Sequence, residues 1–421
     1  MQSVVNKLRW HVVRLDEVAL INPESVGKSY PHKAIQYIDI SSVGSGTLSE
    51  TAIYRLSEAP SRAKRLVKHG DTILSTVRPN RRSFLFIKSP APNLVVSTGF
   101  AVLRQANRID ARFLYYAVTN PAFTDYLSAN MKGAAYPAVD TETIARATIA
   151  LPPLAVQRKI AAILSAYDDL IENNTRRIQI LEEMAQTIYR EWFVKFRFPG
   201  HENVTMVDSE LGPIPEGWES KTFSDIAELS RDGINPSTFE DELFTHYSFP
   251  AFDNGQMPIL ERGTAIRSNK YIVVHDSVLL SKLNPRFPRV WLPVVDREHR
   301  AIASTEFLVL KPKPPTTSTY LFSLCRSPEF LNAFAKRALG TSTSHQRVKP
   351  DDLFGMPILL PQKRLITAFS DSTTPILNFT YNLRLRTANL RRTRDMLLPK
   401  LISSELDVGE LDIDTEGLGY G

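Results

Sequence analysis

Apolar or small residues recur at steps of three and four along two long stretches of the chain. In the first stretch, which follows Leu151-Pro-Pro153, the recurring positions run from 160 to 192, with one four-residue stutter and one polar residue, Asn174. Steps that alternate three and four place residues along one face of a helix, as in a coiled coil. The pattern predicts a helix over 157–197 that is roughly 60 Å long at ~1.5 Å per residue.

A second stretch of this kind begins at Gln362, and the natural partner of one helix is the other. Because proline disfavours a helix interior, we expect the second helix to break near Pro375 and to resume at Ile376. The two helices are predicted to pair antiparallel as a coiled coil, in which a buried Asn174 sets the register. The residues predicted to line the helix pair are Ile160, Ile163, Tyr167, Leu170, Asn174, Leu181, Ile188, Ile376, Leu383, Leu390 and Leu397.

The chain also contains an internal repeat. Segment 113–123 aligns with 320–330 at an offset of 207, and each predicts an aromatic-rich helix followed by a Pro-x-Phe turn. The same offset places Val96-Ser-Thr-Gly-Phe100 on Ala303-Ser-Thr-Glu-Phe307. Before each long helix, short β-branched runs alternate with Gly, Pro and Asn turns. The prediction is an α+β fold with two similar α+β domains, separated by two long antiparallel helices, in a pseudo-two-fold internal repeat.

Changes of pattern divide the chain into segments. Gly and Pro residues indicate a linker between the two repeats, and an acidic composition marks the last segment, which we expect to be solvated and loosely ordered. The predicted segments are a first α+β domain at 1–150, a helical region at 151–198, a linker at 199–215, a second α+β domain at 216–360, a second helical region at 361–406 and the acidic tail at 407–421.

Composition narrows the class of protein. The chain has 51 Lys and Arg against 45 Asp and Glu, a net charge of +6, which is compatible with a polyanionic partner but too mild to demonstrate one. A single cysteine, Cys325, excludes an intramolecular disulfide framework and a Cys-based zinc site. No stretch approaches the ~18 apolar residues of a membrane span, so we expect no membrane partner and a cytoplasmic location.

Several enzyme classes lack their motifs in this sequence. Val26-Gly-Lys-Ser29 ends like a phosphate-binding loop, but Asn22 stands where that loop needs a glycine. Pro350-Asp-Asp352 resembles the start of a nuclease pattern, but no Asp/Glu-x-Lys triplet follows it. No Gly-rich strand-to-helix turn for a methyl donor is present. We predict a non-catalytic chain with no metal site and no cofactor of its own.

Two basic segments follow predicted strands at corresponding places in the repeat. The first is Arg78-Pro-Asn-Arg-Arg82, and the second is Lys282-Leu-Asn-Pro-Arg-Phe-Pro-Arg289. Arginine forks suit guanine edges or phosphates, and asparagine suits adenine. The two turns are therefore candidates for contact with DNA, and the alternative is a solvated loop of long side chains.

Other segments give weaker signals. Loops 133–138 and 340–347 contain small and polar residues that can approach a groove closely. The arginines of 384–394 on the second helix more often mark a solvated or partner-facing side than a DNA contact. The candidate DNA-binding residues are Arg78, Asn80, Arg81, Arg82, Tyr136, Lys282, Asn284, Arg286, Arg289, His345, Gln346 and Arg347.

The two helical regions resemble conserved regions of a known family. Leu151-Pro-Pro-Leu-Ala-Val-Gln157, with the Asp168-Asp-Leu-Ile-Glu-Asn-Asn174 that follows, resembles the central conserved region of the specificity subunits of Type I restriction-modification systems. Arg394-Asp-Met-Leu-Leu-Pro399, continuing to Leu406, resembles the distal conserved region. The chain departs from the family pattern at Val156, where Glu is usual, and at Ser404, where Gly is usual.

The resemblance implies a function for each part. Each α+β domain would be a target-recognition domain that reads one half of a gapped site in double-stranded DNA. The helices would fix the separation of the halves and dock two modification subunits, which use S-adenosylmethionine to methylate an adenine in each half. Two restriction subunits, motor-nucleases that depend on ATP and Mg, would join for cleavage. The alternative is a tandem coiled-coil adaptor without sequence-specific DNA binding.

Overall fold

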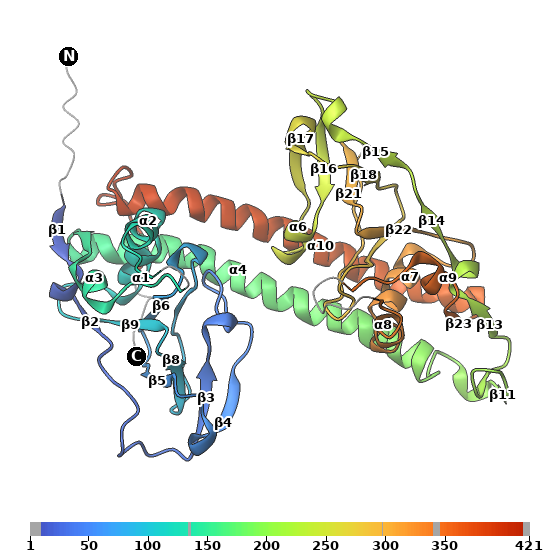
Figure 1. The fold of residues 1–421 in the computed structure, drawn as a ribbon, viewed down its shortest axis with the longest axis horizontal. Coiled ribbons are helices and arrows are strands. Elements are labelled where there is room, and N and C mark those ends of the chain that lie inside the picture. Colours follow the sequence, from blue (N-terminus) through green and yellow to red (C-terminus); the bar gives the residue numbers. More distant parts are fainter. Residues whose placement is uncertain (1–9, 134–135, 297, 340–345, 416–421) are drawn as a thin grey trace. The chain divides into compact units, whose positions relative to one another are not determined.

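The structure is a computed structural model, and it describes residues 10–133, 136–296, 298–339 and 346–415 (Figure 1). The chain divides into two compact units. Unit 1 comprises residues 1–170 together with 390–421, and unit 2 comprises residues 171–389. Unit 1 is therefore built from both ends of the chain, whereas unit 2 is continuous in sequence.

Unit 1 contains two four-stranded sheets, with strand orders β2-β9-β6-β7 and β4-β3-β8-β5, and a separate β1-β10 pair. Three short helices accompany the sheets. The strands are β1 (His11–Arg14), β2 (Ala19–Ile21), β3 (Ala34–Ile38), β4 (Ala52–Arg55), β5 (Ala63–Leu66), β6 (Thr72–Ser75), β7 (Phe84–Phe86), β8 (Leu94–Ser97), β9 (Phe100–Gln105) and β10 (Thr148–Leu151). The helices are α1 (Ala111–Thr119), α2 (Pro121–Ala129) and α3 (Thr141–Arg146).

Unit 2 repeats this architecture. Its sheets have the orders β14-β22-β19-β20 and β15-β18-β21-β16-β17, with the pairs β13-β23 and β11-β12 beside them. The strands are β11 (Met206–Val207), β12 (Ile214–Pro215), β13 (Glu219–Thr222), β14 (Ala227–Ser230), β15 (Gly233–Ile234), β16 (Leu243–Tyr247), β17 (Ile259–Arg262), β18 (Lys270–Ile272), β19 (Val278–Ser281), β20 (Val290–Trp291), β21 (Arg300–Ser304), β22 (Phe307–Pro312) and β23 (Pro357–Leu360). The short helices are α5 (Phe223–Ile226), α6 (Phe249–Asp253), α7 (Ser318–Arg326), α8 (Pro328–Ala335) and α9 (Pro350–Phe354).

Strand pairing confirms the internal repeat. The order β2-β9-β6-β7 in unit 1 matches β14-β22-β19-β20 in unit 2, strand for strand. In the second sheet of each unit, one parallel pair stands among antiparallel ones, β3 with β8 and β16 with β21. These pairs correspond at the same places in the two repeats. The α+β fold class predicted from the sequence is confirmed.

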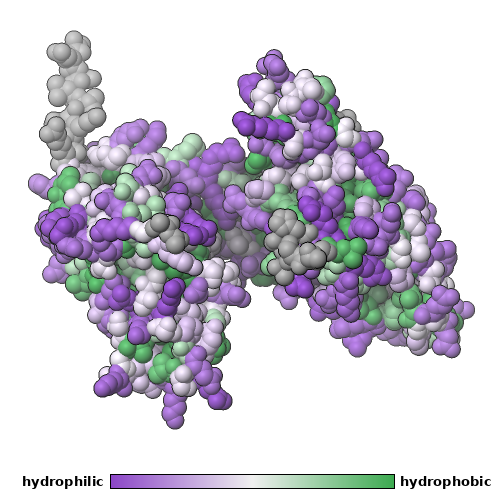
Figure 2. All heavy atoms as spheres, viewed as in Figure 1, coloured by the Kyte–Doolittle hydropathy of each residue, from purple (hydrophilic) through white to green (hydrophobic). Residues whose placement is uncertain are grey.

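Local sequence explains why these elements form. β6 and β19 are buried at every position, as short apolar runs between turn residues predict. Asp110 begins α1 because its carboxylate accepts hydrogen bonds from the backbone N–H groups of Arg112 and Phe113. Asn120 caps α2 in the same way, and Pro121 fits the first helical turn, where no N–H partner is needed. On the face shown in Figure 2, hydrophilic side chains predominate and hydrophobic ones are scattered between them.

Two long helices run through both units, α4 (Leu154–Tyr189), which ends in the π-helical turn η5 (Arg190–Val194), and α10 (Lys363–Ile402). In unit 1, Asp168 of α4 binds Arg394 of α10 at 2.6 Å. In unit 2, the rings of Tyr189 and Phe369 meet edge to face with centroids 5.9 Å apart. Positions later in α4 therefore meet positions earlier in α10, and the predicted antiparallel pairing is confirmed.

The buried side of α4 differs in detail from the predicted one. Ile160 and Asn174 are buried, but Leu170 is 53% exposed and Ile171 is buried instead. Buried or half-buried positions of α4 include 160, 164, 167, 171, 174, 178, 181, 185 and 189. The prediction is therefore one position off at Leu170, where the helix buries the next residue instead. Of the remaining predicted positions, Leu383 is buried and Ile163, Tyr167, Leu181, Ile188, Ile376, Leu390 and Leu397 are half-buried.

The predicted break at Pro375 is wrong, because α10 continues without interruption from Lys363 to Ile402. Proline removes the hydrogen bond to the carbonyl four residues earlier, which here belongs to Asp371. Both Pro375 and Asp371 are exposed, so water can satisfy that carbonyl. A proline on the solvent side of a helix held by its other face is tolerated.

Two segments predicted to lie outside the domains contribute to them. Within 199–215, predicted as a linker, β11 and β12 form a hairpin and Ile214 is buried in the core of unit 2. In the acidic tail, Val408 is buried in the core of unit 1, and Lys159 Nζ donates to the carbonyl of Gly409 at 2.6 Å. The expectation of a solvated tail is wrong at 408–409, because one valine reaches an apolar surface that a count of charges does not reveal. Residues 416–421 lie outside the described residues.

None of the helices in the described part of the chain combines the length and apolar character that crossing a membrane requires.

Candidate DNA interface

The two predicted basic segments form the same turn in both units. Arg78 and Asn284 each adopt a left-handed conformation, with φ of 48° and 49°, and each precedes a buried proline. In each turn, the backbone N–H three residues later donates to the carbonyl of this left-handed residue, from Arg81 to Arg78 at 2.9 Å and from Phe287 to Asn284 at 2.8 Å. The turns therefore correspond position by position.

Each turn is tied to the second predicted loop of its unit. In unit 1, the N–H of Arg78 donates to the carbonyl of Pro137 at 2.9 Å, and in unit 2 the N–H of Asn284 donates to that of Gln346 at 2.8 Å. Matching β-bridges flank these bonds, Val77 with Ala138 and Leu283 with Arg347. Segments about sixty residues apart in sequence thus meet at one place in each unit, as a paired turn and loop.

In unit 1, Asn80, Arg81 and Tyr136 are the exposed members of the candidate set, with Tyr136 75% exposed. The guanidinium of Arg78 lies over the Tyr136 ring, 6.0 Å from its centroid, and links turn to loop. Arg82 is used internally, because its Nη2 donates to the carbonyl of Thr119 at 3.1 Å.

In unit 2, Arg286 is exposed, Lys282 is half-buried and two predicted arginines are engaged by acids. Arg289 binds the carboxylate of Asp253 through two bonds of 2.7 and 2.8 Å. Arg347 binds Glu306 at 2.9 Å, and this bond lowers the pKa of the Glu306 carboxyl. Both arginines therefore brace the turn and loop and carry less free charge than the sequence suggested.

The remaining candidates in unit 2 have backbone roles or cannot be placed. Asn284 and Gln346 are half-buried, and their backbone groups join the turn to the loop. His345 lies outside the described residues. Phe287, which sequence reasoning did not select, is 69% exposed at the tip of the turn. Its signal was the Pro-Arg-Phe-Pro string, where prolines on both sides hold an aromatic residue in a tight turn.

Two arginines of the second helix, Arg384 and Arg394, face acids of α4. Glu182 of α4 binds Arg326 at 3.0 Å and also binds Arg384, all within unit 2. Burial raises the pKa of Glu182, but the two guanidinium groups outweigh it and the pKa is lowered. In unit 1, Asp168 accepts from Arg394 and from the Tyr116 hydroxyl, the latter at 2.7 Å. These arginines hold helices together rather than extend the basic turns.

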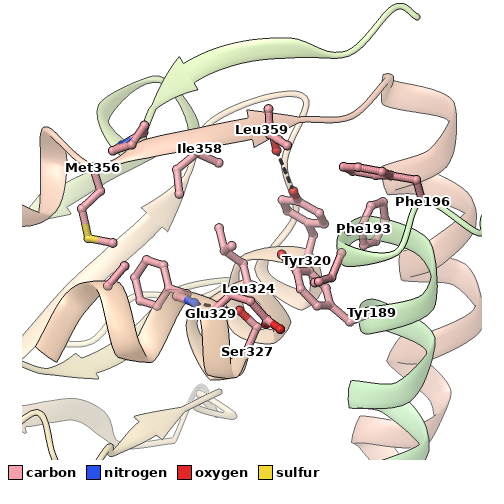
Figure 3. A pocket seen from close by; sticks show the side chains of 14 residues that line it. Tyr189, Phe193, Phe196, Tyr320, Leu324, Ser327, Glu329, Met356, Ile358 and Leu359 are labelled. Atoms are coloured by element: carbon pink, nitrogen blue, oxygen red, sulfur yellow. Dashed lines mark hydrogen bonds between the residues drawn. The ribbon is translucent and has the colours of Figure 1, made fainter. Parts of the chain in front are cut away.

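A pocket of about 280 Å³ in unit 2 has different chemistry (Figure 3). Its floor is aromatic, with the Tyr320 hydroxyl donating to the carbonyl of Leu359 at 3.5 Å, and Glu329 lies among its lining residues. Phe196, next to the π-helical turn, lines it in a left-handed conformation with φ of 59°. The described residues around this pocket include no Lys or Arg, so it does not suit a phosphate.

Across residues 10–133, 136–296, 298–339 and 346–415, no group of three or more His, Cys, Asp or Glu side chains could hold a metal ion.

The fold defines an internally repeated α+β protein with one braced, exposed turn in each unit. A sequence model of the "Type I restriction modification DNA specificity domain" matches residues 7–183. The specificity subunit of the Type I restriction enzyme MjaIX of Methanocaldococcus jannaschii is 25% identical over 357 residues, covering 81% of this chain and 78% of that protein. The specificity subunit of the Type I restriction enzyme HindI of Haemophilus influenzae is 24% identical over 458 residues, covering 90% of this chain and 95% of that protein.

A solved structure, the S subunit of a Type I restriction-modification system from M. genitalium, has the same fold, with a TM-score of 0.57 at 13% identity over 95% of this chain and 98% of that one. Along most of its length the chain is therefore similar to specificity subunits of Type I restriction-modification systems.

Proposed function

We propose that the chain binds double-stranded DNA at a bipartite, gapped sequence, with each unit reading one half. The observation that carries the proposal is the repeated turn. In both units, a buried strand is followed by a left-handed residue and a proline, and the turn is hydrogen-bonded to a second loop. Both turns expose polar or cationic side chains to solvent. Asn80 and Arg81 suit adenine and guanine edges, and Arg286 suits guanine or a phosphate.

The proposal also assigns partners to the chain. Two modification subunits would dock on α4 and α10 and methylate adenine with S-adenosylmethionine, and two restriction subunits would supply ATP- and Mg-dependent cleavage. The chain itself contributes recognition and no catalysis. Exposed apolar side chains along the two helices support a docking role, because a partner's surface would shield them from water. They are Leu170, Ile180, Met184, Phe379, Leu385 and Met396.

Methylome sequencing of cells that express this chain with its cognate modification subunit tests the proposal. We expect a gapped adenine-methylation motif that appears only when the chain is present. If no motif appears while the same modification subunit is active beside another specificity subunit, the proposal is wrong and the adaptor alternative replaces it.

Variants in unit 1 sharpen the test. Arg81→Ala should relax one base position in one half of the motif, since a bidentate contact contributes ~1–3 kcal/mol of discrimination. Arg55→Ala removes another exposed arginine, from the edge strand β4, and serves as the matched control. An identical motif for Arg81→Ala and the wild type would remove this turn from the recognition surface.

A further inference from the structure

The two turns present different chemistry at the same position. A backbone bond from Ser75 to Ser83 closes the turn of unit 1 at 2.8 Å, and a bond from Ser281 to Arg289 closes that of unit 2 at 2.9 Å, which fixes an offset of 206. At this offset Asn80 corresponds to Arg286, and Arg81 corresponds to Phe287. Where unit 1 offers a guanidinium, unit 2 offers a hydrocarbon ring.

The turn of unit 2 holds this ring away from the core. Pro285 before it is buried, and Arg289 after it is fixed by Asp253 and by the ring of Phe249, 4.7 Å from the guanidinium carbon. Phe287 remains 69% exposed between these two anchors. A braced position of this kind loses little conformational entropy when its side chain meets a surface.

A phenyl ring has no hydrogen-bond donor or acceptor, so it can distinguish base pairs only through apolar contact. In the major groove the thymine 5-methyl group is the apolar feature of the base edges. We propose that Phe287 packs against the 5-methyl group of a thymine in the half-site read by unit 2. This inference rests on the proposed function and adds to it a contact that does not depend on charge.

Deoxyuridine scanning tests the contact directly, because deoxyuridine is thymidine without the methyl group. Complexes of the chain with its modification subunit are titrated with duplexes in which each thymine of the mapped motif is replaced in turn. We expect one replacement to weaken binding about fourfold, which corresponds to the ~0.8 kcal/mol of one buried carbon group. For Phe287→Ala, that replacement should change affinity no further.

The controls separate this contact from other effects. Leu260→Ala removes a comparably exposed apolar side chain from β17 of unit 2 and should keep the wild-type sensitivity to deoxyuridine. Sensitivity that persists in Phe287→Ala overturns the inference. So does weaker binding by Phe287→Ala with no sensitive thymine, which would indicate a ring inserted between base pairs. Loss of sequence-selective binding by the wild-type complex would instead overturn the proposed function.

Discussion

Replacing Glu182 by alanine should destabilise unit 2, because this carboxylate lies between two arginines. Its side chain is 17% exposed, and it binds Arg326 at 3.0 Å as well as Arg384. Burial lowers the pKa of Arg384 even with Glu182 beside it, so the charge is poorly solvated. The variant would leave two facing guanidinium groups with no counter-charge.

The magnitude follows from this burial. Breaking a fully buried ion pair costs about 3–5 kcal/mol. Because all three side chains keep some contact with water, we expect about 2–4 kcal/mol for Glu182→Ala, with a smaller loss for Glu182→Gln, which keeps one acceptor oxygen. Glu183→Ala alters the next residue of α4, which is exposed, and provides the control.

Tryptophan fluorescence during chemical denaturation is a suitable assay, since Trp192, Trp218 and Trp291, three of the chain's four tryptophans, belong to unit 2. Hydrogen exchange of peptides from α7 and α1 then assigns the effect to unit 2 or unit 1. Equal stability of Glu182→Ala and Glu183→Ala would refute the reasoning, as would faster exchange spread evenly over both units.

Three further predictions concern other buried groups. Burial lowers the pKa of His246, so the neutral imidazole stabilises the folded protein fully above its unfolded pKa of about 6.5, and this stabilisation is lost as the pH falls below that value. Between about pH 7.5 and 5, the melting temperature should therefore fall less steeply for His246→Gln than for the wild type. A chain ending at Leu406 should lose about 2 kcal/mol from unit 1 because Val408 leaves the core, whereas one ending at Gly409 should melt like the wild type. Gln157→Leu removes three hydrogen bonds of a buried side chain, to Asp110, Arg108 and Pro152, and should cost about 3 kcal/mol; a change below 1 kcal/mol in denaturant titration would contradict this account.

Much of the fold could be predicted from the sequence because its signals are local or repeated. The periodic apolar positions gave both long helices, and the offset repeat gave two α+β domains. The predicted break at Pro375 and the inward-facing Leu170 were wrong because both depend on which side of a helix meets solvent. Burial of Val408 depends on a contact with a distant core, which no neighbouring residue signals.

For the candidate site, the sequence located the turns but not the role of each side chain. Arg82, Arg289 and Arg347 appeared as free cations, yet their partners lie 37, 36 and 41 residues away in sequence. Hydrogen bonds of the folded turn were also needed to align Arg81 with Phe287, because the offset of 207 found in the sequence would align it with Pro288. Tertiary placement therefore decides which residues of a basic turn remain available to a ligand.

The composition of unit 1 from both ends of the chain has a consequence for synthesis. The Asp168–Arg394 ion pair and the Lys159–Gly409 hydrogen bond join residues 226 and 250 positions apart. During translation, unit 2 emerges as one continuous stretch, while unit 1 lacks part of its core until Leu398, Leu401 and Val408 have left the ribosome. The first α+β domain to be synthesised is thus the last to be completed, because its core needs residues from the end of the chain.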